Sequence, residues 1–440
     1  MKHVVIVGGG FAGVNCAKKL AEHPEVRITL IDRHNHQQFQ PLLYQVAAGF
    51  LAPSNVAYSL RNMLVRHQNI EIQLDEIVSA DLNNRSVTSA NGKTYHGDFL
   101  VLAAGSQANF FGTPGADKHS YPLYSLHDAE LLRSRILAVL EAANRDQSLI
   151  AKGALNFVLV GAGPTGTEMA GTLGDMIHHA LREEYPSLPL SEAGIYVVDM
   201  GHCVLGAFST KAQAYAAKML EQRGVKVHLH TAVKEVAPGH VVLGDGTIIP
   251  THTVVWAGGL RASDFSGNMG IRQGHGGRVD VAPDLTVPGL KGVYALGDFA
   301  NITGKNDEHL PQLASVAEQS GKWCAKNILA DIAEKPRKPF AYFDKGIMAM
   351  IGRGSAVAEM GAHRYELEGP MAFTAWLGVH VALLSTMHAK VEAIVEWAWD
   401  YFSEVRGDQV LDRFSQEEID WNADSDVPSA SEAKPAKSSS

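Results

Sequence analysis

Only three cysteines occur among the 440 residues, Cys16, Cys203 and Cys324, and no two of them form a CxxC pair. This excludes a disulfide framework and a cysteine-rich zinc site, and we expect no bound metal. The sequence also lacks any run near the ~20 apolar residues that a membrane-spanning helix needs. Its first residues, MKHVVIV, show no cleavable signal pattern, so a cytoplasmic location is the default expectation.

Positive charge is scarce as well. Lys and Arg number 38 against 47 Asp and Glu, which gives a net charge of −9. Nucleic acid is therefore not an expected partner, because the chain has no basic field to attract it. With 46% hydrophobic residues, the chain is long enough for two or three domains that each bury a core.

The N-terminus has the pattern of a dinucleotide-binding unit. A strand at 4–7 precedes GGGFAG at 8–13, a helix with periodic apolar residues follows, and a second strand at 26–31 ends at Asp32. Glycines let a pyrophosphate approach the N-terminus of a helix, and the acid can accept a hydrogen bond from a ribose hydroxyl. A tight turn without a ligand is the alternative. The expected contacts are Gly8, Gly10, Phe11, Ala12, Gly13, Asp32 and Arg33.

The same pattern occurs a second time. A strand at 156–160 leads into GAGPTG at 161–166, and a strand at 195–198 ends at Asp199. The similarity continues through a hairpin turn at Asn91-Gly92 and the strand DFLVLAAGS, which match a turn at Asp245-Gly246 and the strand THTVVWAGG. Two dinucleotide sites are therefore predicted. The further contacts expected are Ala104, Gly105, Gly161, Gly163, Pro164, Thr165, Gly166, Asp199 and Gly258.

The first unit resumes after the second, in TVPGLKGVYALGDFA at 286–300. The second unit is thus an insertion. A strand ending at Gly297-Asp298 would bring a carboxylate to the first nucleotide, where it can accept hydrogen bonds from polyol hydroxyls. An ordinary helix N-cap at Asp298 is the alternative.

These residues resemble the two-dinucleotide-binding-domain flavoproteins. The resemblance implies an α/β fold of two Rossmann-like domains, with FAD at residues 1–115 and 258–335 and NAD(P)H in an inserted domain at 116–257. It also implies that Asp298 binds the flavin. Asp199 is followed by Met200-Gly201-His202, with no Arg for a 2′-phosphate, which favours NADH over NADPH.

The positions of the cysteines argue against two groups of enzymes within this superfamily. Disulfide reductases carry a CxxxxC pair after the first unit, and the stretch 40–49 has no cysteine. Sulfide:quinone reductases also use cysteines near the flavin, and Cys203 follows the second nucleotide strand, which is a poor position for that role. Cys16 and Cys324 fall in expected amphipathic helices and are predicted to be buried.

Four segments together resemble the type II NADH dehydrogenases: FQPLLYQVAAG, GAGPTGTEMAG, YALGD and YFDKGIMAMIGRGSAVAEMG. The resemblance covers residues 1 to about 405. It implies hydride transfer from NADH to FAD and then electron transfer to a membrane quinone, without proton pumping. It also implies that the loop 38–49, with Gln40 and Pro41, lies against the flavin ring. This loop belongs to a run, 34–60, without Lys, Arg, Asp or Glu, and packing between the domains is the alternative.

The resemblance also assigns catalytic residues. Glu168 in PTGxE would lie near flavin and nicotinamide, with a first-turn carboxylate at a helix dipole as the alternative. The family's AQxAxQ corresponds to ASVAEQ at 314–319, so Gln319 matches and Ser315 replaces the first glutamine. Both can share one helix face and meet a quinone, or Gln319 is a plain surface residue. Lys345 matches YFDKG without an argument for its role.

The region 336–425 is expected to bind a membrane or form a homodimer. The run 371–387 has no Lys, Arg, Asp or Glu and predicts an interfacial helix or hairpin. The next helix has an acidic stripe of Glu392, Glu396, Asp400 and Glu404, which would face the cytosol, while Val391, Ile394, Val395 and Ala398 face inward or toward lipid. Peripheral binding to the cytoplasmic face is favoured over a purely dimeric role. The tail 426–440 is predicted to be disordered.

Two other functions stay open at this point. One is a soluble NADH-dependent flavoprotein reductase of a protein or small-molecule acceptor, which Ser315 and the acidic stripe favour. The other is an NADH-sensing flavoprotein whose partners change when NADH binds. Rapid NADH oxidation with a short-chain quinone would eliminate the second.

Overall fold

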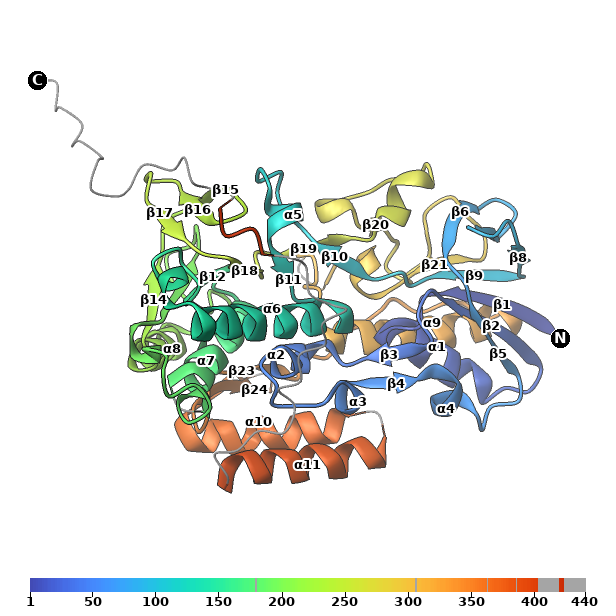
Figure 1. Ribbon diagram of the computed structural model, residues 1–440. Coiled ribbons are helices and arrows are strands. Elements are labelled where there is room, and N and C mark those ends of the chain that lie inside the picture. The colour runs from blue at the N-terminus through green and yellow to red at the C-terminus, as the bar shows by residue number, and fades with distance from the viewer. Residues whose placement is uncertain (179, 305–306, 362, 385, 403–418, 423–440) are drawn as a thin grey trace, which may run out of the picture.

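A computed structural model describes residues 1–178, 180–304, 307–361, 363–384, 386–402 and 419–422. Two α/β bodies lie side by side, and a pair of antiparallel helices runs beneath them (Figure 1). Among these residues no helix is both long and apolar enough to cross a bilayer. The predicted disordered tail, 426–440, and Glu404 lie outside the described residues.

The first body contains a five-stranded parallel sheet in the order β21-β9-β1-β2-β5. The central strands β1, β2 and β9 are mostly Val, Ile and Leu and mostly buried, as a covered parallel sheet requires, whereas the edge strand β5 is partly exposed. Helices α1 (Phe11–Ala21) and α9 (Ala314–Ile332) pack against each other, with the predicted buried Cys16 and Cys324 at 0% exposure. The strands are β1 (Lys2–Val7), β2 (Val26–Asp32), β5 (Ile70–Leu74), β9 (Phe99–Leu102) and β21 (Val293–Ala295).

The second body repeats this arrangement in the order β11-β18-β12-β13-β14. Helix α7 (Pro164–His178) follows β12, and α6 (Leu126–Arg145) begins with a capping box between Ser125 and Asp128. The strands are β11 (Tyr121–Pro122), β12 (Asn156–Val160), β13 (Gly194–Val198), β14 (Val225–His228) and β18 (Thr253–Trp256), and α5 (Ala116–His119) and α8 (Thr210–Gln222) complete the body.

Each body carries a three-stranded antiparallel meander, and the second hairpin turn of each falls where the sequence predicts it, at Asn91-Gly92 and Asp245-Gly246. The meanders are β6 (Ile77–Asp81), β7 (Ser86–Ser89) and β8 (Thr94–His96), and β15 (Val233–Val236), β16 (His240–Leu243) and β17 (Ile248–Pro250). The chain passes between the bodies near β10 (Ser106–Ala108) and β19 (Leu260–Ala262), which pair antiparallel. A short parallel pair, β20 (Val279–Asp280) with β22 (Ala300–Asn301), lies beside them. The predicted fold class, one Rossmann-like unit inserted in another, is confirmed.

The C-terminal region is a three-stranded antiparallel sheet followed by two helices. The sheet comprises β23 (Gly346–Met350), β24 (Ala356–Met360) and β25 (Tyr365–Glu368). Most of the uncharged run 371–387 forms a single helix, α10 (Gly369–Leu383), which packs on this sheet. Helix α11 (Met387–Phe402) follows it in the antiparallel direction, and the two form the α10–α11 hairpin (Figure 1).

The uncharged run 34–60 is not the irregular loop that the sequence predicts. It folds into β3 (His36–Gln38), the 3₁₀ helix η1 (Gln40–Leu42), α2 (Leu43–Ala47), α3 (Pro53–Val56), β4 (Ala57–Ser59) and α4 (Leu60–Leu64). Helix α2 packs on α6 and α7, and its residues belong to the core that the second body shares with α10. Packing between the domains, the alternative, therefore accounts for the missing charges of α2, because a charge there would be buried without a partner.

Candidate functional site

Two glycine loops follow β1 and β12, and their outer glycines have matching geometry. Gly8 has φ +105° and Gly161 has φ +106°. A Cβ on Gly13 would come within 1.8 Å of the Gly8 carbonyl oxygen, and one on Gly166 within 1.9 Å of the Gly161 oxygen. The outer positions therefore accept only glycine, because the turn and the close packing of helix on strand leave no space for a side chain.

The middle glycines behave differently. A Cβ on Gly10 or on Gly163 would meet no atom within 4 Å, so open space faces both backbones. These positions lie at the N-termini of α1 and α7, where backbone N–H groups have no intrahelical acceptor. Each loop thus fits a pyrophosphate group. Phe11 and Ala12 stand in the first turn of α1, and Pro164 and Thr165 in that of α7.

Each of the two predicted ribose-binding acids accepts one hydrogen bond from the glycine loop and one from the turn that follows its own strand. Asp32 Oδ2 accepts from the Gly9 N–H at 2.5 Å and Oδ1 accepts from the His34 N–H at 2.7 Å. Asp199 repeats this with Ala162 at 2.6 Å and Gly201 at 2.5 Å. Each carboxylate oxygen keeps a second lone pair for a ligand hydroxyl. Arg33 is exposed beside Asp32.

Asp298 does not cap a helix, so the alternative role is wrong. The N-cap of the 3₁₀ helix η7 (Gly297–Phe299) is Leu296. The Asp298 carboxylate instead accepts hydrogen bonds from Ser106 Oγ at 3.0 Å and Tyr124 Oη at 3.4 Å. Burial raises the pKa of Asp298, and the two hydroxyl bonds oppose that shift. Sequence reasoning missed Ser106, although it ends the segment DFLVLAAGS, and Tyr124, which belongs to no motif.

Other predicted flavin contacts lie around the same end of the first sheet. Gly105 and Gly297 have φ of +69° and +60°, and Gly105 follows Ala104 at the end of β9. Gln40 Oε1 is buried with no hydrogen-bond partner among the described groups, next to Pro41 in η1. A buried acceptor of this kind fits a donor on a bound ligand. Gly258 follows β18 at the corresponding end of the second sheet.

Glu168 is buried inside α7 and is not a first-turn carboxylate, so that alternative is wrong. Its Oε1 accepts from the Met350 N–H at 3.2 Å. Burial raises the pKa of Glu168 to about 8, although the Met350 N–H and the Trp376 side chain favour the charged form. The carboxyl is therefore mostly protonated at pH 7 and can exchange its proton near neutrality.

An aromatic layer around Glu168 was not predicted. The rings of Trp376 and His380 stack with centroids 4.0 Å apart, and burial lowers the pKa of His380 to about 4. Tyr44, whose pKa is raised by burial and by Glu168, lies on α2. The sequence signal for this layer is weak, because the spacing of Trp376 and His380 is that of any apolar helix face.

Ser315 and Gln319 lie on one face of α9, as expected, but both contact the segment before β23. Ser315 Oγ is 2.8 Å from Tyr342 Oη. Gln319 Nε2 donates to the Phe343 carbonyl and its Oε1 accepts from the Phe343 N–H, both at 2.9 Å. Gln319 is thus not a plain surface residue. Lys345 lies 3.9 Å from Glu318.

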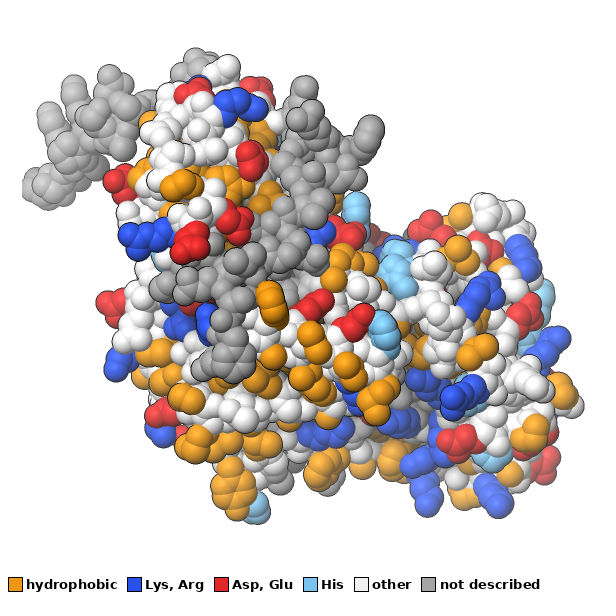
Figure 2. Space-filling model, turned by 60° about the horizontal axis from the view of Figure 1, so that its bottom comes forward, with side chains coloured by type: hydrophobic (Ala, Val, Ile, Leu, Met, Phe, Trp, Pro, Cys, Tyr) orange, Lys and Arg blue, Asp and Glu red, His pale blue; other side chains and the backbone are white. Residues whose placement is uncertain are grey.

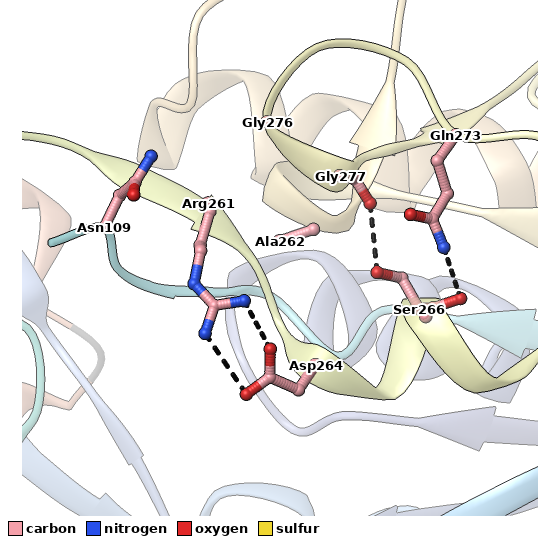
Figure 3. Close-up of a pocket in the computed structure, with 9 residues that line it drawn as sticks. Asn109, Arg261, Ala262, Asp264, Ser266, Gln273, Gly276 and Gly277 are labelled. Atoms are coloured by element: carbon pink, nitrogen blue, oxygen red, sulfur yellow. Dashed lines mark hydrogen bonds and ion pairs between the residues drawn. The ribbon is translucent and has the colours of Figure 1, made fainter. Parts of the chain in front are cut away.

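A cavity of about 320 Å³ lies beside β19 (Figure 3). Arg261 and Asp264 form an ion pair at its wall, and Ser266 Oγ donates to the Gly277 carbonyl at 3.0 Å. None of the predicted site residues lines this cavity. Among the residues that the structure describes, no group of three or more His, Cys, Asp or Glu is placed to hold a metal ion.

The outer face of the α10–α11 hairpin is apolar. Glu392 is half-buried on the inner side of α11, next to Tyr58, so the expectation that the acidic stripe faces the cytosol is wrong for this residue. The side chain of Asp400 is outside the described set. Hydrophobic side chains gather on the underside of the molecule (Figure 2). The apolar residues exposed by 45–76% on these helices are Met371, Leu383, Met387, Val391, Ile394, Val395 and Trp399.

Three comparisons with known proteins agree. The family model described as pyridine nucleotide-disulphide oxidoreductase matches residues 2–321. The type II NADH:quinone oxidoreductase Ndh of Mycobacterium tuberculosis is 36% identical over 420 residues, which cover 92% of this chain and 89% of that protein. NDH2 of Plasmodium falciparum, solved in complex with NADH, has a TM-score of 0.84 at 19% identity and covers 92% of this chain and 99% of its own. The sulfide:quinone oxidoreductase of Aquifex aeolicus shares the fold, with a TM-score of 0.70 at 19% identity over 92% of this chain and 96% of its own.

Proposed function

This chain belongs to the type II NADH:quinone oxidoreductase family, and from that membership we propose how its residues carry out the reaction. The enzyme oxidises NADH with FAD, passes two electrons to a quinone and pumps no protons. Whole-chain relatives with this activity count against the soluble reductase and the NADH sensor.

The observation that carries the proposal is the pair of matching glycine loops, each with its own acid. We assign FAD to the first loop with Asp32 and Asp298, and NADH to the second with Asp199. Bound together, the two cofactors supply a hydride donor and a ring that accepts it. The chain contributes the geometry, because the loops and acids fix both dinucleotides through groups that are already in place.

We propose that Glu168 donates one proton to the quinone. Reducing a quinone to a quinol takes up two electrons and two protons, and because the hydride of NADH carries both electrons and one proton, one further proton must be supplied. A buried carboxyl with a pKa of about 8 holds a proton at neutral pH and can release it to a nearby acceptor. Tyr44 and Trp376 lie beside this buried carboxyl, which limits proton exchange with bulk water.

Two substitutions test the assignment of FAD to the first loop and NADH to the second. We expect Asp199→Ala to raise the KM for NADH about tenfold while the purified protein stays yellow, since one charge-assisted hydrogen bond is lost. Asp32→Ala should instead lose flavin during purification. The absorbance ratio at 450 and 280 nm, together with NADH and NADPH kinetics using menadione and ubiquinone analogues, measures both effects. The opposite pattern would reverse the assignment.

The apolar face of the α10–α11 hairpin is proposed to bind the cytoplasmic side of the membrane peripherally. Two exposed valines of α11, Val391 and Val395, would each bury apolar area in the lipid interface. Val391→Glu with Val395→Glu should lower binding to phosphatidylcholine vesicles by about tenfold or more in a flotation assay. Val65→Glu, at a valine 74% exposed on the first body, is the matched control and should bind normally.

A homodimer also remains part of the proposal, and the same apolar face is the alternative place for its interface. Sedimentation velocity of the double variant separates the two roles of the face. If Val391→Glu with Val395→Glu leaves vesicle binding intact but converts a dimer to a monomer, the face is a subunit interface and the membrane assignment is wrong.

A further inference from the structure

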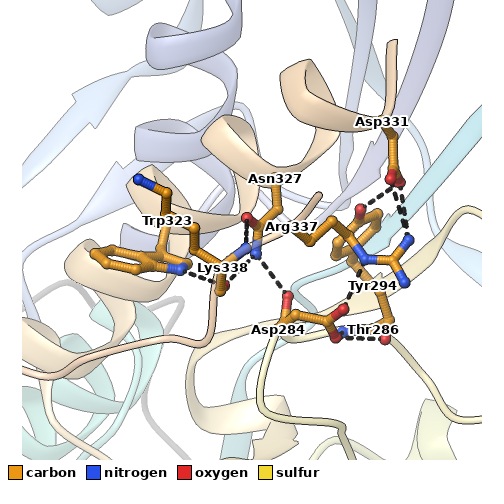
Figure 4. A network of polar contacts seen from close by, with 8 residues as sticks. All are labelled: Asp284, Thr286, Tyr294, Trp323, Asn327, Asp331, Arg337 and Lys338. Carbon is orange, nitrogen blue, oxygen red and sulfur yellow. Dashed lines mark hydrogen bonds and ion pairs between the residues drawn. The ribbon is translucent and has the colours of Figure 1, made fainter. Parts of the chain in front are cut away.

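Helix α9 presents a polar side chain every four residues along one face, and each contacts residues 337–343, here called the strap. The strap joins α9 to β23 and runs along the helix. Figure 4 shows its first part, where Trp323, Asn327 and Asp331 hold Arg337 and Lys338. The full series on α9 is Ser315, Gln319, Trp323, Asn327 and Asp331.

Two of these side chains hold the strap by its backbone. Asn327 donates to the Lys338 carbonyl and accepts from the Lys338 N–H, both at 3.0 Å. Gln319 makes the equivalent pair of bonds with Phe343. These bonds fix the strap at both ends. The amide of Gln319 has therefore already used one donor and one acceptor within the protein.

The contact between Ser315 and Tyr342 is of another kind, because it joins two hydroxyl groups at 2.8 Å. When one hydroxyl donates to the other, the proton of the acceptor stays available for a third group. Tyr342 is half-buried, and burial raises the pKa of its phenol, so the phenol keeps its proton at neutral pH. The pair thus offers one donor that the fold does not use.

This pair stands at the flavin end of α9. Ser315 is the second residue of the helix. Just before it, Gln312 donates to the Asp298 carbonyl at 3.1 Å, and one turn later Ser320 Oγ accepts from the Gly297 N–H at 3.2 Å. The bonds of Gln312 and Ser320 therefore place the end of α9 that carries the Ser315–Tyr342 pair at the segment that we assign to the flavin.

We propose that Tyr342 is a substrate-contacting residue, whose hydroxyl, paired with Ser315, donates a hydrogen bond to a quinone carbonyl. This inference rests on the proposed function. The sequence resemblance places a glutamine amide where this chain has Ser315, and a serine hydroxyl is too short to replace it. The phenol supplies the missing reach from the strap, so the polar group comes from another segment.

Tyr342→Phe tests this with the flavin-loaded enzyme. We expect the KM for ubiquinone-1 to rise about tenfold with kcat little changed, since one neutral hydrogen bond to the substrate is lost. NADH:ferricyanide activity should be unchanged, because that acceptor needs no quinone contact. Tyr365→Phe, at a tyrosine 69% exposed on β25, is the matched control and should leave both activities as they are.

A rescue variant separates recognition from stability. Ser315→Gln placed in the Tyr342→Phe background restores a long polar side chain and should lower the KM for ubiquinone-1 at least severalfold. An unchanged KM in Tyr342→Phe, or no recovery in the double variant, overturns the inference while the proposed function stands. If the unmodified enzyme reduces ferricyanide but no quinone, the proposed function itself fails.

Discussion

Replacing Glu168 with Gln is expected to lower kcat for quinone reduction about 100-fold or more, while NADH oxidation with ferricyanide stays near the unmodified rate. The amide matches the carboxyl in size but cannot release a proton. Ferricyanide takes single electrons and no protons, so it bypasses this step. Stopped-flow reduction of the flavin by NADH, measured in the same preparation, should also be unaffected.

The pH dependence gives an independent check. Because the pKa of Glu168 is about 8 in the fold against 4.5 ordinarily, quinone turnover should fall above pH 8 as the proton is lost. The folded chain also binds more protons than the unfolded chain between these values, so the raised pKa lowers stability as pH rises from about 4.5 to about 8. Glu168→Gln has no group that titrates there. Between about pH 4.5 and pH 9, its free energy of unfolding should therefore rise by up to about 5 kcal/mol relative to that of the unmodified protein.

Two results would contradict the proton role of Glu168. Quinone turnover in Glu168→Gln within a factor of two of normal is one. An unchanged alkaline limb in the variant is the other, since it would assign the titration to a different group.

Asp175→Ala is expected to destabilise the protein by about 3–5 kcal/mol. Asp175 and Arg223 form an ion pair at 2.9 Å, with each side chain only 11% exposed. Asp175 Oδ2 also accepts from the Arg353 N–H at 2.5 Å, and Arg223 donates to the Arg353 carbonyl at 3.0 Å. These bonds tie α7 and α8 to the turn between β23 and β24. Removing the carboxylate leaves a buried guanidinium without its counter-charge.

Urea unfolding monitored by tryptophan fluorescence measures this effect. Asp264→Ala is the comparison. It breaks the surface ion pair between Asp264, 70% exposed, and Arg261, 42% exposed, and should lower the free energy of unfolding by less than about 1 kcal/mol. Similar losses in both variants would show that burial does not decide the strength of the Asp175 pair.

The sequence predicts the repeated architecture well because its signals are local. Glycine positions such as Gly8 and Gly161 are dictated by backbone geometry within a few residues, so their roles are visible in the spacing alone. The central parallel strands are mostly apolar runs, which the sequence alone identifies. The uncharged run 371–387 indicates helix α10, although not its pairing with α11.

What the sequence does not show depends on contacts between distant segments. Helix α2 was expected as a loop, since nothing local reveals that α6 and α7 cover it. Tyr124 reaches Asp298 across 174 residues, and Tyr342 meets Ser315 only because the strap doubles back along α9. The orientation of α11 was also undecided, because an amphipathic pattern gives two faces and does not say which one is inside.

Because β10 pairs antiparallel with β19, the inserted domain could be exchanged for another during evolution or by design. Ala108 and Leu260 are partners in this ribbon, so the inserted domain enters and leaves through adjacent points. A module with neighbouring ends can be exchanged for another without rebuilding its host. Grafting an inserted unit of different coenzyme preference at this junction would alter the electron source while the flavin body and the membrane face stay as they are.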